Sequence, residues 1–91
     1  MIRIKLILLD EVLRRAIGEK EVTLDLPEEA TVEDLLKRAT VEYGSVVLEA
    51  ASKPGTSILL NGQSIDFLGG LKARLSDGDR VAIIPLIVGG F

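Results

Sequence analysis

The sequence predicts a single α+β domain in which a mixed β-sheet carries one main helix packed across it. Two stretches near the N-terminus alternate apolar and polar residues, as strands with one buried face do. Residues 31–44 instead repeat apolar residues at helical spacing. Hairpin and strand signals follow within residues 58–65 and 81–84. The order hairpin, helix, short hairpin and last strand favours one mixed sheet covered by a helix.

The first strand is expected within residues 1–9, whose predicted core face consists of Ile2, Ile4, Leu6 and Leu8. Residues 10–21 form a polar stretch that we expect to connect this strand to the next. In the second strand, residues 22–26, alternate apolar residues again define one face. Pro27 ends this strand because proline cannot donate a hydrogen bond to a neighbouring strand.

The main helix is expected to begin after Thr31, which precedes two acidic residues in the manner of a capping box. Apolar residues recur at helical spacing and form one stripe: Val32, Leu35, Leu36, Ala39 and Tyr43. Gly44 supplies a left-handed stop just beyond the stripe. Residues 45–52 favour a strand in their first half and a helix in their second, and both alternatives stay open.

Asn61-Gly62 lies between two apolar runs and is a strong signal for a tight hairpin. Phe67 and Leu68 follow in a loop, where we expect them to anchor the core, with contact to a partner as the alternative. A second tight turn at residues 76–79 precedes the last strand, which Pro85 ends.

The composition excludes several kinds of function. The 91 residues carry a net charge of -3 and contain no Cys and no His, so thiol chemistry, soft metal ligation and a His-based nucleophilic triad are all unexpected. The basic residues are scattered, which argues against a nucleic-acid surface. The apolar N-terminal run is too short to span a membrane. We therefore expect a cytoplasmic protein that binds neither nucleic acid nor membrane, holds no metal and is not an enzyme.

The C-terminus is unusual because its apolar residues lead into the pair Gly89-Gly90. Glycine weakens a strand and gives a core no side chain, so this pair does little for the fold. A frayed tail and a functional tail remain equally good interpretations of the residues alone. In the functional interpretation, the slim tail threads a narrow channel and delivers a carboxylate to another protein's active site.

Three runs of residues together with this glycine pair resemble the MoaD/ThiS family of ubiquitin-like sulfur carriers. The three runs are Asn61-Gly62-Gln63-Ser64-Ile65, Phe67-Leu68-Gly69-Gly70-Leu71 and residues 75–85. The resemblance implies a ubiquitin-like β-grasp domain over residues 1–86 and a flexible C-terminal tail over residues 87–91. The long middle section is more similar to the small subunit of molybdopterin synthase, archaeal type, than to the shorter thiamine-pathway carriers.

The resemblance also implies a chemistry. An E1-like adenylating enzyme would use ATP and Mg²⁺ to activate Gly90, with Gly89 as its slim neighbour, and sulfur transfer would then yield a thiocarboxylate. A protein like the large subunit of molybdopterin synthase would receive that sulfur. The carrier itself would bind no cofactor. The alternatives are a ubiquitin-like modifier that Gly90 joins to lysines of other proteins, and an interaction module with an inactive tail.

Phe91 departs from the family pattern, in which the directly active members end in Gly-Gly. We favour a precursor from which a metallopeptidase removes Phe91, so that Gly90 becomes the terminal residue. A divergent member that no longer carries sulfur, and a tail used only for docking, are the alternatives. Leu86, Ile87 and Val88 also differ from the second proline and small residues of many relatives.

A docking face can be predicted from strand phase. Ile7 and Ile84 fall on the phase opposite to the core residues of the first and last strands, which lie side by side in a β-grasp sheet. We expect an apolar patch for a partner that also uses Leu9, Leu59 and the tail residues Leu86, Ile87 and Val88. Arg74 and Arg80 are expected to be solvated, with pairing to an acidic activating enzyme as the alternative.

Overall fold

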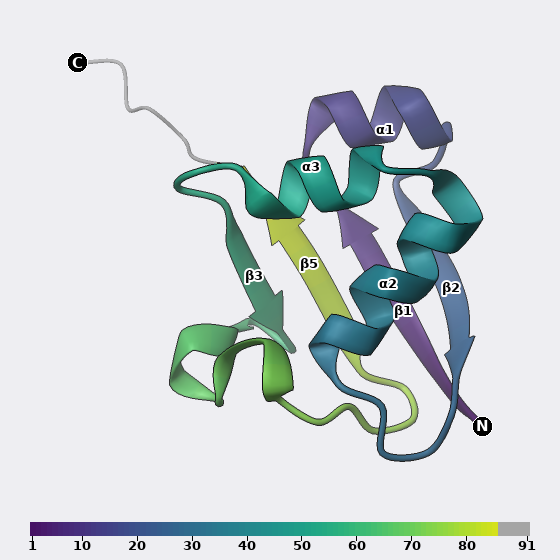
Figure 1. Cartoon of the computed structure of the whole chain (residues 1–91), viewed down its shortest axis with the longest axis vertical. Coiled ribbons are helices and arrows are strands. Elements are labelled where there is room, and N and C mark those ends of the chain that lie inside the picture. The colour runs from purple at the N-terminus through teal and green to yellow at the C-terminus, as the bar shows by residue number, and fades with distance from the viewer. Residues whose placement is uncertain (86–91) are drawn as a thin grey trace.

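The structure is a computed structural model that describes residues 1–85, and it consists of a five-stranded sheet with its helices on one face (Figure 1). The strands are β1 (Ile2–Leu8), β2 (Glu21–Leu26), β3 (Ser57–Leu60), β4 (Gln63–Ser64) and β5 (Arg80–Ile84). The helices are α1 (Glu11–Ile17), α2 (Val32–Tyr43) and α3 (Val46–Ser52), with two 3-10 turns, η1 (Ile65–Phe67) and η2 (Gly70–Lys72).

The strand order across the sheet is β2-β1-β5-β3-β4. The central strands β1 and β5 run parallel, whereas β1 with β2, β3 with β5, and β3 with β4 are antiparallel. The sheet is therefore mixed, and the predicted α+β class with one main helix is confirmed. The first and last strands are neighbours, as the prediction of a docking face requires.

The core lies between the sheet and the helices. Every second residue of β1 is buried, and the side chains of Ile4, Leu6 and Leu8 have no exposed surface. The neighbouring β5 contributes Val81 and Ile83, which are equally inaccessible. The alternation predicted from the sequence thus separates an inner face from an outer face.

The main helix α2 begins at a complete capping box. The hydroxyl of Thr31 accepts a hydrogen bond from the Asp34 amide, and the Asp34 carboxylate accepts one from the Thr31 amide at 2.9 Å. The hydrogen bonds that the Asp34 carboxylate accepts from the Thr31 amide and the Thr31 hydroxyl lower the pKa of Asp34 below its ordinary value of 3.8. The helix ends before Gly44, which has a φ of 97°. Both predicted helix boundaries are confirmed, but the predicted left-handed stop is wrong, because the ψ of Gly44 is 176°.

The interpretation of residues 10–21 as only a polar connection is wrong, because they contain helix α1. Asp10 caps this helix by accepting a hydrogen bond from the Leu13 amide at 3.1 Å, and Gly18 ends it with a φ of 83°. Leu13 has no exposed surface and belongs to the core. A single buried residue in a two-turn helix leaves almost no periodic signal in the sequence.

The structure also decides between the two alternatives for residues 45–52, because Val46–Ser52 form helix α3. Val47 and Ala50 are buried on one side of this short helix, at the spacing of one helical turn. The hairpin predicted at Asn61-Gly62 is confirmed, since these residues connect β3 to β4. Their φ values of 50° and 85° are the positive pair that a tight two-residue hairpin turn requires.

The prediction that Phe67 and Leu68 anchor the core is wrong. The side chain of Phe67 is 82% exposed and that of Leu68 is 36% exposed. Ile65, which begins the same 3-10 turn, is buried and supplies the apolar anchor of this loop. A 3-10 turn directs successive side chains about a third of a turn apart, so only one of its three residues faces the core.

No helix within residues 1–85 is both long and apolar enough to cross a membrane.

Candidate functional site

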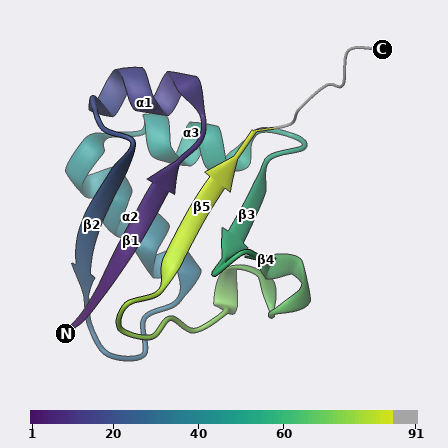
Figure 2. The same cartoon turned by 180° about the vertical axis from the view of Figure 1, so that it is seen from behind.

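The open face of the sheet is the candidate functional site. In Figure 2, α2 and α3 lie behind the sheet and α1 lies beyond the upper ends of β1 and β2, so that none of these three helices covers the face turned toward the viewer. This face displays the outward residues of β2, β1, β5 and β3, and strand register fixes which of them are neighbours.

An apolar row crosses the middle of this face and consists of Ile7, Ala82 and Leu59. Ile7 on β1 lies opposite Ala82 on β5, and Ala82 lies opposite Leu59 on β3. All three side chains are half-buried by their neighbours in the sheet. The row therefore presents a continuous apolar surface across three strands, and no polar side chain interrupts it.

The apolar surface extends toward the carboxyl end of β5. Ile84 lies two residues beyond Ala82 on the same face and is opposite Ser57 on β3. Leu9 is 43% exposed, and its amide donates to the Ile83 carbonyl at 3.2 Å. The structure thus brings Ile7, Leu59 and Ile84 to one face, as the sequence predicts. Their role as partner contacts stays a prediction.

The remaining predicted site residues lie outside the described part of the chain. These are Leu86, Ile87, Val88, Gly89, Gly90 and Phe91, which follow Pro85 directly. Ala82 is the member of the apolar row that the sequence prediction omitted. The alternation of residues 80–84 placed it on the outer face, but a small side chain carries little weight in a search for apolar patches.

Lys5 and Arg80 form a second row, the cationic row. It lies beside the apolar row, two residues nearer to the start of β5. Lys5 lies directly opposite Arg80 on the parallel pair β1 and β5. Thr23 on β2 lies on the other side of Lys5. On the far side of Arg80 lies Asn61, whose side-chain oxygen accepts a hydrogen bond from the Arg80 amide at 3.0 Å.

The two arginines singled out in the sequence have different surroundings. The guanidinium of Arg74 lies 3.6 Å from a carboxylate oxygen of Glu29. Arg80 makes no ion pair with any carboxylate of the described residues within the 4.0 Å limit. Both arginine side chains are exposed to solvent. Of the two, Arg80 lies on the open face and has no carboxylate partner among the described residues.

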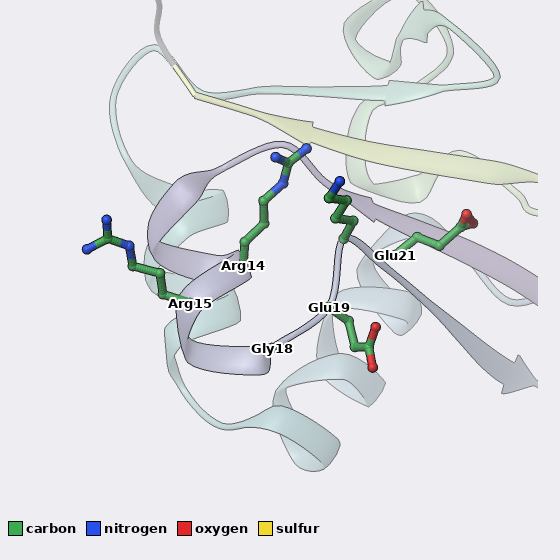
Figure 3. Close-up of a pocket in the computed structure, with 6 residues that line it drawn as sticks. Arg14, Arg15, Gly18, Glu19 and Glu21 are labelled. Atoms are coloured by element: carbon green, nitrogen blue, oxygen red, sulfur yellow. The ribbon is translucent and has the colours of Figure 1, made fainter.

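A shallow, open depression lies where α1 ends and β2 begins (Figure 3). It is lined by Arg14, Arg15, Gly18, Glu19, Lys20 and Glu21. The side chain of Arg14 donates to the Leu8 carbonyl, and Arg15 pairs with Glu11 at 3.1 Å. The labelled arginine and glutamate side chains in Figure 3 point apart and do not converge on a common point. This arrangement offers neither a nucleophile with a base nor a charge-complementary cradle.

Within residues 1–85 no group of three or more His, Asp or Glu side chains is placed to hold a metal ion. Among the described residues, the open face carries apolar and cationic side chains and, on the edge strand β2, the exposed carboxylates of Glu21 and Asp25, but no buried titratable group. The arrangement is therefore suited to binding another protein.

Comparison with known proteins agrees with this description. The model of the ThiS family matches residues 7–90. The chain is 32% identical over 81 residues to the small archaeal modifier protein 3 of Haloferax volcanii, covering 85% of this chain and 88% of the relative.

Solved structures show the same fold. The solution structure of the small archaeal modifier protein 1 from Methanosarcina acetivorans superposes with a TM-score of 0.80 at 30% identity, covering 99% of this chain and 98% of the other. The solution structure of the HVO 2177 protein of Haloferax volcanii gives a TM-score of 0.78 at 28% identity, covering 98% of this chain and 87% of the other.

Proposed function

Because the chain belongs to the ThiS family of ubiquitin-like β-grasp proteins, we propose that it is a sulfur carrier activated at Gly90 after removal of Phe91. The observation that carries the proposal is the extent of the family match, which runs through Gly89-Gly90 and stops one residue before Phe91. In this proposal Gly90 corresponds to the terminal glycine of the family.

The chemistry follows from the poor reactivity of a free carboxylate. In the proposed sequence, a peptidase first hydrolyses the Gly90–Phe91 bond and exposes the Gly90 carboxylate. A carboxylate oxygen then attacks the α-phosphorus of ATP on the activating enzyme, and pyrophosphate leaves. Mg²⁺ neutralises charge on the phosphate oxygens in this step. A sulfide equivalent displaces AMP from the acyl carbon and leaves a thiocarboxylate. The carrier supplies the acyl end and the surface that positions it.

The open face supplies the docking surface in this proposal. Ile84 extends the apolar row along β5 toward Pro85. A partner that covers the row and Ile84 therefore also lies close to Pro85, five residues before Gly90 in the sequence. We assign this role to an E1-like adenylating enzyme. A second partner, similar to the large subunit of molybdopterin synthase, would accept the sulfur for a molybdopterin or tungstopterin cofactor.

A ubiquitin-like modifier is the second candidate, and the 32% identity to a small archaeal modifier protein favours it. The two candidates share the adenylation step. They differ in the nucleophile that attacks the activated Gly90, which is sulfide for a carrier and a lysine amine for a modifier.

Intact mass spectrometry of the protein from its own cells tests the proposal. We expect a species lighter by one Phe residue, with a second form in which one sulfur replaces one oxygen. Lysine-linked Gly-Gly remnants on other proteins, without the sulfur-containing form, would favour the modifier. A sole species that retains Phe91, and that the adenylating enzyme does not activate, would overturn both candidates.

A further inference from the structure

We propose that the cationic row, Lys5 and Arg80, receives an acidic side chain of the adenylating enzyme and thereby selects that enzyme. The inference rests on the proposed function, because it assumes that this enzyme covers the adjacent apolar row. It adds an electrostatic element to the apolar docking surface.

The first argument is that the two cations are neighbours with no matching carboxylate. Directly opposed residues on adjacent strands lie about 5 Å apart, and like charges in such a pair repel. No carboxylate of the described residues lies within 4.0 Å of either charged group, and residues 86–91 contain no Asp or Glu. Both flanking positions, Thr23 and Asn61, are neutral.

The second argument is the contrast with Arg3, which precedes Lys5 by two residues on the same face. Arg3 lies opposite Asp25, and its Nε donates to the Asp25 carboxylate at 3.2 Å. The backbone amide of Arg3 also donates to Asp77 at 2.7 Å. The sheet therefore pairs the cation that lies further from the apolar row. Glu21 shares the open face, opposite Ile7, but no carboxylate of the described residues lies within 4.0 Å of either cation beside that row.

Asp79, which precedes Arg80 in the sequence, has one oxygen engaged by the β3–β4 hairpin and the other by the turn at residues 76–79. One oxygen accepts a hydrogen bond from the Asn61 side-chain amide at 3.0 Å, and the other accepts one from the Ser76 amide at 2.7 Å. Asp79 thus holds the turn in shape, and its carboxylate is directed to those donors. The cationic row is left with capacity for an external acceptor.

The third argument is what happens when a partner covers the apolar row. A protein surface that packs on Ile7, Ala82 and Leu59 also removes water from the adjacent cations, and an unpaired charge at such a site is costly. A partner with a carboxylate at this position compensates that cost, whereas a neutral or basic partner does not. Charge at an interface rim of this kind mainly sets association rate and partner choice.

The position of the row also predicts the layout of the partner. Arg80, Ala82 and Ile84 follow one another along one face of β5, over about 13 Å, in the direction of Pro85 and the tail. The matching surface of the enzyme therefore presents an acidic group, then an apolar area, and then the entrance to its active site. A nucleic acid does not fit this pattern, because its phosphates would leave the apolar row uncovered.

The variant Lys5→Glu gives the sharpest test, because it places a carboxylate opposite Arg80. The new cross-strand ion pair fills the acceptor role from within the chain, so the melting temperature should not fall. The control is Lys37→Glu, an equal charge change on the exposed side of α2. Each variant is prepared as the chain ending at Gly90, and ATP–pyrophosphate exchange is measured with the E1-like adenylating enzyme from the same organism.

We expect Lys5→Glu to raise the KM for the carrier by about tenfold and to leave kcat unchanged, as for the loss of a docking contact. The wild-type KM should rise with salt, and this dependence should weaken in Lys5→Glu but persist in Lys37→Glu. A KM for Lys5→Glu equal to that of the control would overturn the inference alone. Absence of exchange with the wild-type chain ending at Gly90 would overturn the proposed function and the inference together.

Discussion

Ile7 on β1 lies directly beside Ala82 on β5, in the register that pairs the first and last strands of the sheet. This parallel contact joins residues from the two ends of the described chain on a face without a covering helix. Because Leu59 flanks Ala82 on its other side, Ala82 is at the centre of the apolar row.

Ala82→Asp should therefore weaken binding to the adenylating enzyme more than any other single change on this face. A carboxylate here would replace apolar contact at the centre of the row and would lose its water when the partner packs on it, so we expect at least a tenfold loss of affinity. Calorimetric titration of the enzyme with wild-type and variant chains measures the loss. Val41→Asp on α2, where the residue is 80% exposed, is the control, with a small expected effect. Equal losses for both variants would contradict the central position of Ala82.

Leu13→Ala tests the structural importance of the short helix α1. Leu13 has no exposed surface and packs in the core, so its truncation should lower the free energy of unfolding by about 2–5 kcal/mol. Val12→Ala, in the same helix, removes a side chain that is 55% exposed and should cost less than about 0.5 kcal/mol. Urea denaturation measures both. Similar values for the two variants would mean that α1 does not pack as described.

The alternating strands and the capped helix were predictable because their signals repeat. Each outward residue of β1 follows an inward one, and the Thr31–Asp34 capping box marks the start of α2 without reference to the rest of the chain. Helix α1 gave no such signal, since it has two turns and buries only Leu13. Its caps, Asp10 and Gly18, were the local evidence that could have revealed it.

The candidate site was predictable in part for a related reason. Strand phase alone places Ile7 and Ile84 on the outer face, but it does not give their lateral neighbours. The contact between Lys5 and Arg80 depends on the register of two strands separated by most of the chain. That register is set by the packing of the whole core, so the cationic row became visible only in the folded structure.

Phe67→Ser tests the correction concerning the loop after β4. Since Phe67 is 82% exposed, the substitution should change the free energy of unfolding by less than about 0.5 kcal/mol. Ile65→Ala in the same 3-10 turn removes a buried side chain and should cost about 2–5 kcal/mol. Thermal and urea unfolding of both variants provide the comparison. A loss for Phe67→Ser as large as that for Ile65→Ala would restore Phe67 as a core anchor.

The capping box of α2 predicts a specific dependence of stability on pH. Hydrogen bonds to Thr31 lower the pKa of Asp34 in the folded chain, so folding favours the ionised carboxylate. The resulting stabilisation is fully present above the unfolded-state pKa and is lost as the pH falls through the lower folded-state value. Urea denaturation from neutral pH to below pH 3 should show Asp34→Asn less stable than wild type at neutral pH, with the difference shrinking in acid. Glu33→Gln, a neighbouring acid outside the reciprocal pair, is the control and should lack most of this pH dependence. A stability difference between wild type and Asp34→Asn that stays constant with pH would mean that the side chain of residue 34 acts by shape alone and not by its charge.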